Sequence, residues 1–228
     1  MSKYLTPAQL EDRIAAIMRR VLGARADEVM CALQGDNWQA ALDRLYATMQ
    51  DELIAELGPE LKTGVLQSAL KLMDTESLAL DTSALGRRAE TFAKNYTYDL
   101  VTGITDTTRE RLADAMSTFM ADGSQDLQTL GKRVEWLFGG GRGQMIATTE
   151  ATRASAKGQR ILVDELKAES PHAKVTMVWQ TSRDEIVCDV CGPLNGTTVK
   201  PGNMEPPAHP NCRCALRIVV LDDGGKGV

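Results

Sequence analysis

Aromatic residues are scarce in this chain and make up only 4% of its 228 residues. Alanine, leucine and methionine are plentiful instead, and this balance favours helices over strands. The chain is 43% hydrophobic and 25% charged, which is ordinary for a soluble globular protein. Its length allows one large domain or two small ones, in either case with a real hydrophobic core.

Long apolar runs are lacking as well. No stretch approaches the roughly 20 residues that a membrane helix needs. The first residues, Met-Ser-Lys-Tyr-Leu-Thr-Pro, lack the apolar core of a signal peptide. We therefore expect no membrane association and a protein that is made and kept in a reducing cytoplasm. In that compartment, clustered cysteines are metal ligands more often than disulfides.

A dense basic surface is also missing. The formal net charge is −5, and residues 171–228 carry six Lys/Arg and six Asp/Glu, so the acidic excess lies within residues 1–170. Sequence-independent binding to duplex DNA requires a basic face, so we expect no strong binding of that kind. The acidic helical part argues for a protein partner.

Apolar residues with helical spacing fill most of residues 7–168. Thr6, Pro7 and Gln9 form a helix start with a capping box, and Gly23 ends that helix. Residues 74–82 and 139–141 are predicted breaks. Further helices are predicted over about 27–33, 38–58, from Pro59 to about 73, over 83–101, from Thr105 to the turn at Gly123-Ser124, over 127–138 and over 144–168.

The pattern changes after Pro171. Residues 174–180 are β-branched and alternating, which predicts a strand, and residues 215–221 predict another. The loop between them is rich in glycine and proline and has little core of its own, so a metal would supply the missing constraint. The predicted fold is mainly α: a multi-helix N-terminal region followed by a small C-terminal β-hairpin and zinc-knuckle module (α+β). Residues 222–228 are expected to form a flexible tail.

Four of the five cysteines and one of the two histidines gather in residues 188–214. A Cys-x-x-Cys pair is followed by His-x-x-Cys-x-Cys, and each short pair lets two soft ligands reach one ion from a tight turn. Thiolates and imidazole favour zinc over magnesium or calcium. Free thiols in a small β-core and a disulfide are the alternatives. The candidate metal ligands are Cys188, Cys191, His209, Cys212 and Cys214.

Five candidates compete for the four places around one ion. Cys188 and Cys191 are the safest ligands, and Cys212 is next. His209 and Cys214 compete for the last place, because His-x-x-Cys is a favourable knuckle whereas ligands two residues apart in a strand need a local bend. Along 212–218 a period of two puts Cys212 and Cys214 on one face. A site filled by four protein ligands is structural, since no position is left for water.

Catalytic interpretations find little support in the sequence. A His-Asn-His nuclease needs extra histidines near the metal, and the other histidine, His172, lies in a separate turn. A zinc deaminase needs a glutamate two residues after the ligand histidine, where Asn211 stands. The segment 139–143 is glycine-rich but follows a helix and lacks the Lys-Ser/Thr of a phosphate-binding loop, so we interpret it as a hinge.

Two further expectations concern single residues. Cys31 has apolar neighbours in a helical segment, so we predict that it is buried as a small hydrophobe. Glu150 and Arg153 lie on the last long helix. They are either solvated surface charges, or they hold the strand and knuckle in place through Arg183 or Asp184.

The C-terminal motifs resemble those of a known family. Residues 179–184, 188–196 and 206–214 resemble the C-terminal signature of the phage Mu F-like minor head proteins, the tailed-phage head morphogenesis family. Residues 145–154 are similar to the family's I-A-R-T-E-x-x-R-A helix. Thr148 stands where the family commonly has arginine, so any salt bridge from that arginine is absent. The resemblance covers roughly residues 100–220, and residues 1–99 resemble nothing specific.

The resemblance implies a low-copy, non-enzymatic minor head protein of a tailed phage. Such proteins associate with the portal and other head proteins, assemble in the host cytoplasm and remain in the virion interior. They act in head morphogenesis and can influence DNA packaging or ejection. Some relatives also carry a toxin domain such as an ADP-ribosyltransferase, for which this chain has no room.

On this basis the chain divides into two regions. Residues 1–99 are expected to dock on portal or capsid, and residues 100–221 to form a head-morphogenesis-like domain with its knuckle at 179–214. Homo-oligomer formation stays open. The competing hypothesis is a zinc-dependent enzyme that processes nucleic acid, with the Cys/His cluster near its active site.

Overall fold

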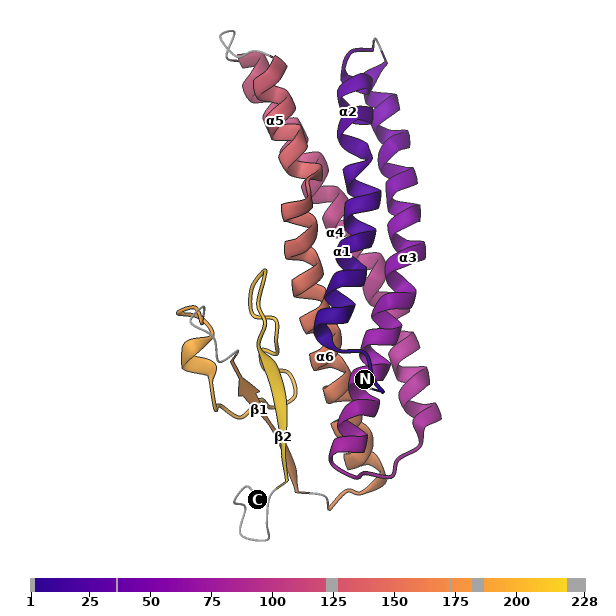
Figure 1. Cartoon of the computed structure of the whole chain (residues 1–228), viewed down its shortest axis with the longest axis vertical. Helices are drawn as coiled ribbons and strands as arrows, with labels where there is room; N and C mark the ends of the chain where they lie inside the picture. The colour runs from indigo at the N-terminus through magenta and orange to yellow at the C-terminus, as the bar shows by residue number, and fades with distance from the viewer. Residues whose placement is uncertain (1–2, 36, 122–126, 173, 182–186, 221–228) are drawn as a thin grey trace.

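The computed structural model describes residues 3–35, 37–121, 127–172, 174–181 and 187–220. Long helices lie side by side in an elongated bundle, and a two-stranded hairpin lies along one flank of its lower half (Figure 1). This confirms the predicted mainly α fold with a small C-terminal hairpin. The elements are α1 (Pro7–Gly23), α2 (Arg25–Leu33), α3 (Trp38–Thr75), α4 (Thr82–Ala121), α5 (Leu127–Phe138), α6 (Gly140–Glu169), β1 (Val175–Gln180), the 3-10 turn η1 (Gly192–Leu194) and β2 (Ala215–Val220).

The start of α1 follows the sequence prediction closely. The backbone N–H of Gln9 donates to Thr6 Oγ1 at 3.2 Å, and the Thr6 N–H donates to Gln9 Oε1 at 2.9 Å, which completes a capping box. The helix then buries Leu10, Ile14 and Met18 against the rest of the bundle. Within the described ranges, every helix lacks an apolar stretch of the length that a bilayer crossing requires.

Helix α3 is continuous through Pro59, so the predicted break between Gly58 and Pro59 is wrong. Proline inside a helix removes one backbone hydrogen bond and usually costs about 3 kcal/mol. On either side of it, Leu57 and Leu61 are each 1% exposed and continue one buried stripe. Burying a leucine is worth about 1.5–3 kcal/mol, so the stripe outweighs the lost hydrogen bond.

Helix α4 is likewise continuous where the sequence predicted a restart at Thr105. Thr105 and Thr108 are buried, and their hydroxyls donate to the carbonyl oxygens of Val101 and Ile104 at 2.9 and 2.6 Å. These bonds within the helix satisfy polar groups that would otherwise favour a turn. The helix also runs through residues 99 and 100 without a break.

Helix α6 packs closely against α1 and α3. A Cβ atom at Gly158 would lie 2.2 Å from the Val65 carbonyl oxygen, and a Cβ atom at Gly143 would lie 3.0 Å from Met18 Cβ. Glycine at these positions therefore lets the neighbouring helix backbones approach. Helix α6 also contacts β2, so it supports the hairpin that follows it.

The remaining predictions have mixed outcomes. The predicted helix over 127–138 and the break after Thr75 are confirmed, and α6 begins already at Gly140. Cys31 is exposed, so its predicted burial is wrong: α2 buries Val29 and turns Cys31 outward. The turn at 123–124 and the tail at 222–228 lie outside the described residues.

Strands β1 and β2 are antiparallel neighbours, with Val175 opposite Val220 and Gln180 opposite Ala215. Both strands were predicted. On the inner face of the hairpin, Met177, Trp179, Leu216 and Ile218 are buried. The loop between the strands carries the Cys/His cluster.

Candidate metal centre

The first ligand pair lies in a tight turn that ends in η1. The backbone N–H of Cys191 donates to Cys188 Sγ at 3.4 Å, and the N–H of Gly192 donates to the Cys188 carbonyl at 2.9 Å. The Cys191 N–H also lowers the pKa of the Cys188 thiol below its ordinary value. Backbone donors of this kind favour the thiolate, which is the form that binds a metal.

The second pair lies in a turn just before β2. The Cys212 N–H donates to the His209 carbonyl at 3.3 Å, and Asn211 adopts a left-handed conformation with φ of 64°. Asparagine tolerates this conformation better than most residues, so its place in the turn has a physical reason. Cys212 and Cys214 are both buried, as their predicted common face requires.

The fold brings all five predicted ligands into one cluster. His209 Nε2 lies 3.1 Å from Cys188 Sγ and 3.2 Å from Cys191 Sγ. Cys191 Sγ lies 3.8 Å from Cys212 Sγ. The ligand atoms fall into two trios that share Cys191, each trio spanning no more than 4.8 Å and each able to hold a metal ion: Cys188, Cys191 and His209, and Cys191, Cys212 and Cys214.

The pKa values of the inner thiols shift in the opposite direction to that of Cys188. Burial raises the pKa of Cys191 and of Cys214 above the ordinary value for cysteine, because a buried thiolate loses its hydration. A bound cation reverses this preference by supplying the compensating charge. The cluster of soft sulfur donors with one imidazole therefore fits a borderline-soft metal and not a hard one.

The ligand turn docks directly on α6. Thr149 Oγ1 accepts a hydrogen bond from the Asn211 N–H at 2.9 Å, and Thr152 Oγ1 donates to the Cys212 carbonyl at 2.7 Å. Thr152 and Cys212 are buried. Two hydroxyls on α6 thus fix the backbone on either side of a ligand.

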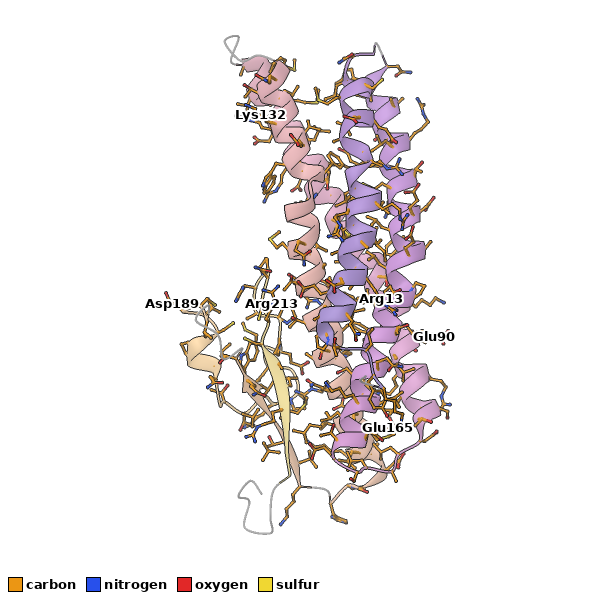
Figure 2. All side chains as sticks on the ribbon, in the orientation of Figure 1. Arg13, Glu90, Lys132, Glu165, Asp189 and Arg213 are labelled. Carbon is orange, nitrogen blue, oxygen red and sulfur yellow. The ribbon has the colours of Figure 1, made fainter. Side chains whose placement is uncertain are left out.

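Arg213, between the two last cysteines, connects the same turn to α1. It pairs with Glu11 Oε1 at 3.0 Å, and that oxygen also accepts from Gln144 Nε2 at 2.6 Å and from Thr148 Oγ1 at 2.8 Å. In Figure 2 Arg213 lies nearer the helices, whereas Asp189 of the first turn lies on the outer side of the module. Thr148 therefore shares the Glu11 carboxylate with Arg213.

A buried ion pair supports the proline-rich part of the loop. Arg160 of α6 pairs with Glu205 at 2.6 Å and donates to the Val199 carbonyl at 3.3 Å. The Arg160 side chain is 6% exposed and that of Glu205 is 27% exposed. Sequence reasoning missed both residues, and its only available signal was an arginine directly before the apolar run that begins at Ile161.

Glu150 is not a solvated surface charge, so the first of the two predictions for Glu150 and Arg153 is wrong for this residue. Glu150 is buried, accepts from the Tyr96 hydroxyl at 2.8 Å and from Arg153 Nε at 3.2 Å, and so joins α6 to α4. Burial raises the pKa of Glu150 above its ordinary value. The predicted partners Arg183 and Asp184 lie outside the described residues.

The glycine-rich segment 139–143 organises the junction of α5 and α6. Gly139 separates the two helices, and Gly140 and Gly141 already lie in α6. Arg142 is buried and donates to the carbonyl oxygens of Leu137 and Ile104 and to Thr108 Oγ1. The arginine therefore joins the C-terminal end of α5, through the Leu137 carbonyl, to α4. The other histidine, His172, is exposed in the turn after α6 and away from the cluster.

These observations define a helical bundle that carries a Cys/His knuckle docked on its last helix. The chain belongs to the family described as Phage Mu protein F like protein, which matches residues 80–217. The match includes all of α4, α5, α6 and the five candidate ligands, and it confirms the resemblance seen in the motifs. No curated protein and no solved structure matches the chain. The family is one of phage head morphogenesis, and that is the role that membership indicates.

Proposed function

We propose that the chain is a minor head protein of a tailed phage, located in the virion interior and bound to the portal during head assembly. Family membership over residues 80–217 is the observation that carries the proposal. A long bundle with a small module fixed along one flank (Figure 1) supports a connecting role. The same placement gives the protein an opportunity to influence DNA packaging or ejection.

The proposal assigns the two ends of the chain different tasks. Residues 1–99 supply the docking surface for the portal or other head proteins, and residues 100–221 form the head-morphogenesis unit with its knuckle. Helix α4 joins the two parts without interruption, so a partner bound to the first part acts on a rigid connection to the second.

The Cys/His cluster binds zinc as a structural ion in this proposal. Cys188, Cys191, His209, Cys212 and Cys214 supply more soft ligands than a tetrahedral ion needs, which leaves no open position for a reacting water. Its task is to connect the outer turn, which carries Cys188, to the turn that docks on α6. The protein accordingly acts without catalysis.

Affinity purification of the tagged chain from cells that produce the phage tests the main proposal. Samples are taken before and after capsid maturation. We expect portal and head proteins in stoichiometric amounts with the wild type at both stages. Recovery of the chain alone, free in the cytosol, would contradict the proposal.

A zinc-dependent enzyme that processes nucleic acid is the alternative, because the cluster contains a histidine beside several thiolates. Zinc-loaded protein incubated with single-stranded and duplex DNA distinguishes the two. Cleavage that disappears in Cys188→Ser but persists in Cys31→Ser, a change of the exposed cysteine away from the cluster, would favour the enzyme.

A further inference from the structure

We infer that one metal ion is held by Cys188, Cys191, His209 and Cys212, and that Cys214 stays outside the coordination shell as the neighbour of the Trp179 indole. The inference rests on the proposed zinc binding and decides between ligand sets that the spacing alone leaves open. Three separate features of the cluster support it.

The first feature is the fixed orientation of His209. Its Nδ1 lies 2.8 Å from the Pro210 carbonyl oxygen, which can only accept, so Nδ1 carries the proton and donates. In the neutral ring Nε2 then has a free lone pair, and this atom faces Cys188 Sγ and Cys191 Sγ. A carbonyl that fixes the ring and tautomer in this way is typical of a histidine that ligates metal.

The second feature is the spacing of the sulfur atoms. Zinc–sulfur bonds of about 2.3 Å in a tetrahedron give sulfur–sulfur separations of about 3.8 Å. The Sγ atoms of Cys191 and Cys212 already lie 3.8 Å apart. The two contacts from Nε2 to sulfur, 3.1 and 3.2 Å, need to widen by a few tenths of an ångström to about 3.6 Å.

The backbone around each pair agrees with this choice. Cys188 and Cys191 are three residues apart across one turn, and His209 and Cys212 are three residues apart across another, closed by the Cys212 N–H on the His209 carbonyl. Each turn thus offers two ligands, and Cys191 belongs to both trios. Cys212 is grouped with Cys191 but not with Cys188 and His209, so it has to move toward them to complete a tetrahedron. Cys214 lies two residues beyond Cys212, at the residue before β2 begins.

The third feature is a separate partner for Cys214. Trp179 is 1% exposed, and its Nε1 has no hydrogen bond of ordinary geometry within the described residues. Trp179 pairs with Leu216 across the hairpin, and Cys214 lies two residues before Leu216 on the same buried face, so its sulfur is a diagonal neighbour of the indole. An unpaired buried N–H is costly, and the Cys214 sulfur is an acceptor on that same face.

Cobalt substitution of the full chain tests the ligand set, because the intensity of thiolate-to-cobalt charge transfer follows the number of bound thiolates. Purified protein is loaded with Co²⁺, and its spectrum is compared with those of Cys214→Ala, Cys212→Ala and His209→Cys. We expect one ion per chain and an unchanged spectrum in Cys214→Ala. We expect Cys212→Ala to lose about one third of the charge-transfer intensity, and His209→Cys to gain about one third, as three thiolates become two or four.

The possible outcomes distinguish an error in the ligand set from an error in the proposed zinc binding. A Cys214→Ala variant that loses a third of the intensity, with Cys212→Ala unchanged, would overturn the ligand set while leaving metal binding intact. Failure of the wild type to take up Co²⁺ or Zn²⁺ would overturn both. Cys214→Ser, which keeps a polar atom for the Trp179 N–H, gives the same readout if Cys214→Ala does not fold, and Cys31→Ser is the matched control.

Discussion

The bundle and the C-terminal module are stabilised in different ways. The bundle buries continuous stripes such as Leu53, Leu57 and Leu61 of α3, and apolar packing supplies most of its core. The module has two short strands and a loop rich in glycine and proline, and it depends on a cluster of soft ligands and on hydrogen bonds to α6. The comparison teaches that a small module with little core can be given a defined position by a large neighbour and a proposed ion.

Removal of the proposed metal should have the largest effect, and it should destabilise the module far more than the bundle. Chelation is expected to raise amide hydrogen exchange over residues 174–181 and 187–220 by roughly two orders of magnitude or more, because metal binding and folding are coupled in small sites. The core positions of α3 and α6 should change little. Exchange that rose equally throughout the chain would contradict the separation.

Gly158→Ala should disturb the bundle in turn. Its Cβ atom would lie 2.2 Å from the Val65 carbonyl oxygen and 3.1 Å from the Ala69 nitrogen, both of them backbone atoms. We expect a loss of about 2–3 kcal/mol in the free energy of unfolding, measured with urea. Gly103→Ala is the control: it lies inside α4 with nothing within 4 Å of its Cβ, and it should stabilise by about 0.5–1 kcal/mol.

Glu205→Ala should act on the contact between the two regions. It leaves the buried Arg160 guanidinium without its carboxylate, which should cost about 1–3 kcal/mol and raise exchange in the proline-rich loop. Lys62→Ala breaks the exposed pair with Glu90 and should cost less than about 1 kcal/mol. Equal effects of the two changes would mean that the Arg160 contact does not position the module.

The smallest expected effect is on how the stability of the bundle depends on pH. Burial raises the pKa of Glu150 in the folded protein, so the folded state binds a proton more readily than the unfolded chain does. Stability then falls as pH rises between the ordinary and the raised pKa. Glu150→Gln removes this titration while keeping an acceptor for Tyr96. Its melting temperature should therefore improve relative to wild type as pH rises from about 4 to 7. A relative decline of the variant over that range would show that Arg153 dominates the electrostatics of Glu150.

The sequence predicted local features better than distant ones. The capping box at Thr6 and the two strands depend on residues close together in the chain, and they are confirmed. The structure also brings the Cys/His side chains together, and their binding of a metal stays a prediction. The breaks at Pro59 and Thr105 were wrong, because buried stripes and hydroxyl bonds within the helices override local preference. The predicted burial of Cys31 was also wrong, because α2 directs this side chain away from the core.

The docking of the knuckle on α6 and α1 could not be predicted from the sequence, because it depends on contacts between distant residues. Thr149 and Thr152 differ in no visible way from other threonines on helices, and Glu11 is one of many surface acids until the fold places it beside Arg213. Such contacts join residues far apart in the chain, and neither spacing nor composition encodes them. The ligand cluster was predictable because cysteine is rare in the rest of the chain.

The Glu11–Arg213 pair spans a separation of 202 residues, and this has a consequence for synthesis. Helix α1 leaves the ribosome before its main packing partner, α6, and before the knuckle that closes over Glu11. The part of its apolar face that packs on α6 therefore stays uncovered until α6 has been made, and contacts of such long range form slowly. A nascent chain interrupted before the knuckle lacks both Arg213 and the second ligand turn, so the contact between α1 and the knuckle can form only after these residues have been made.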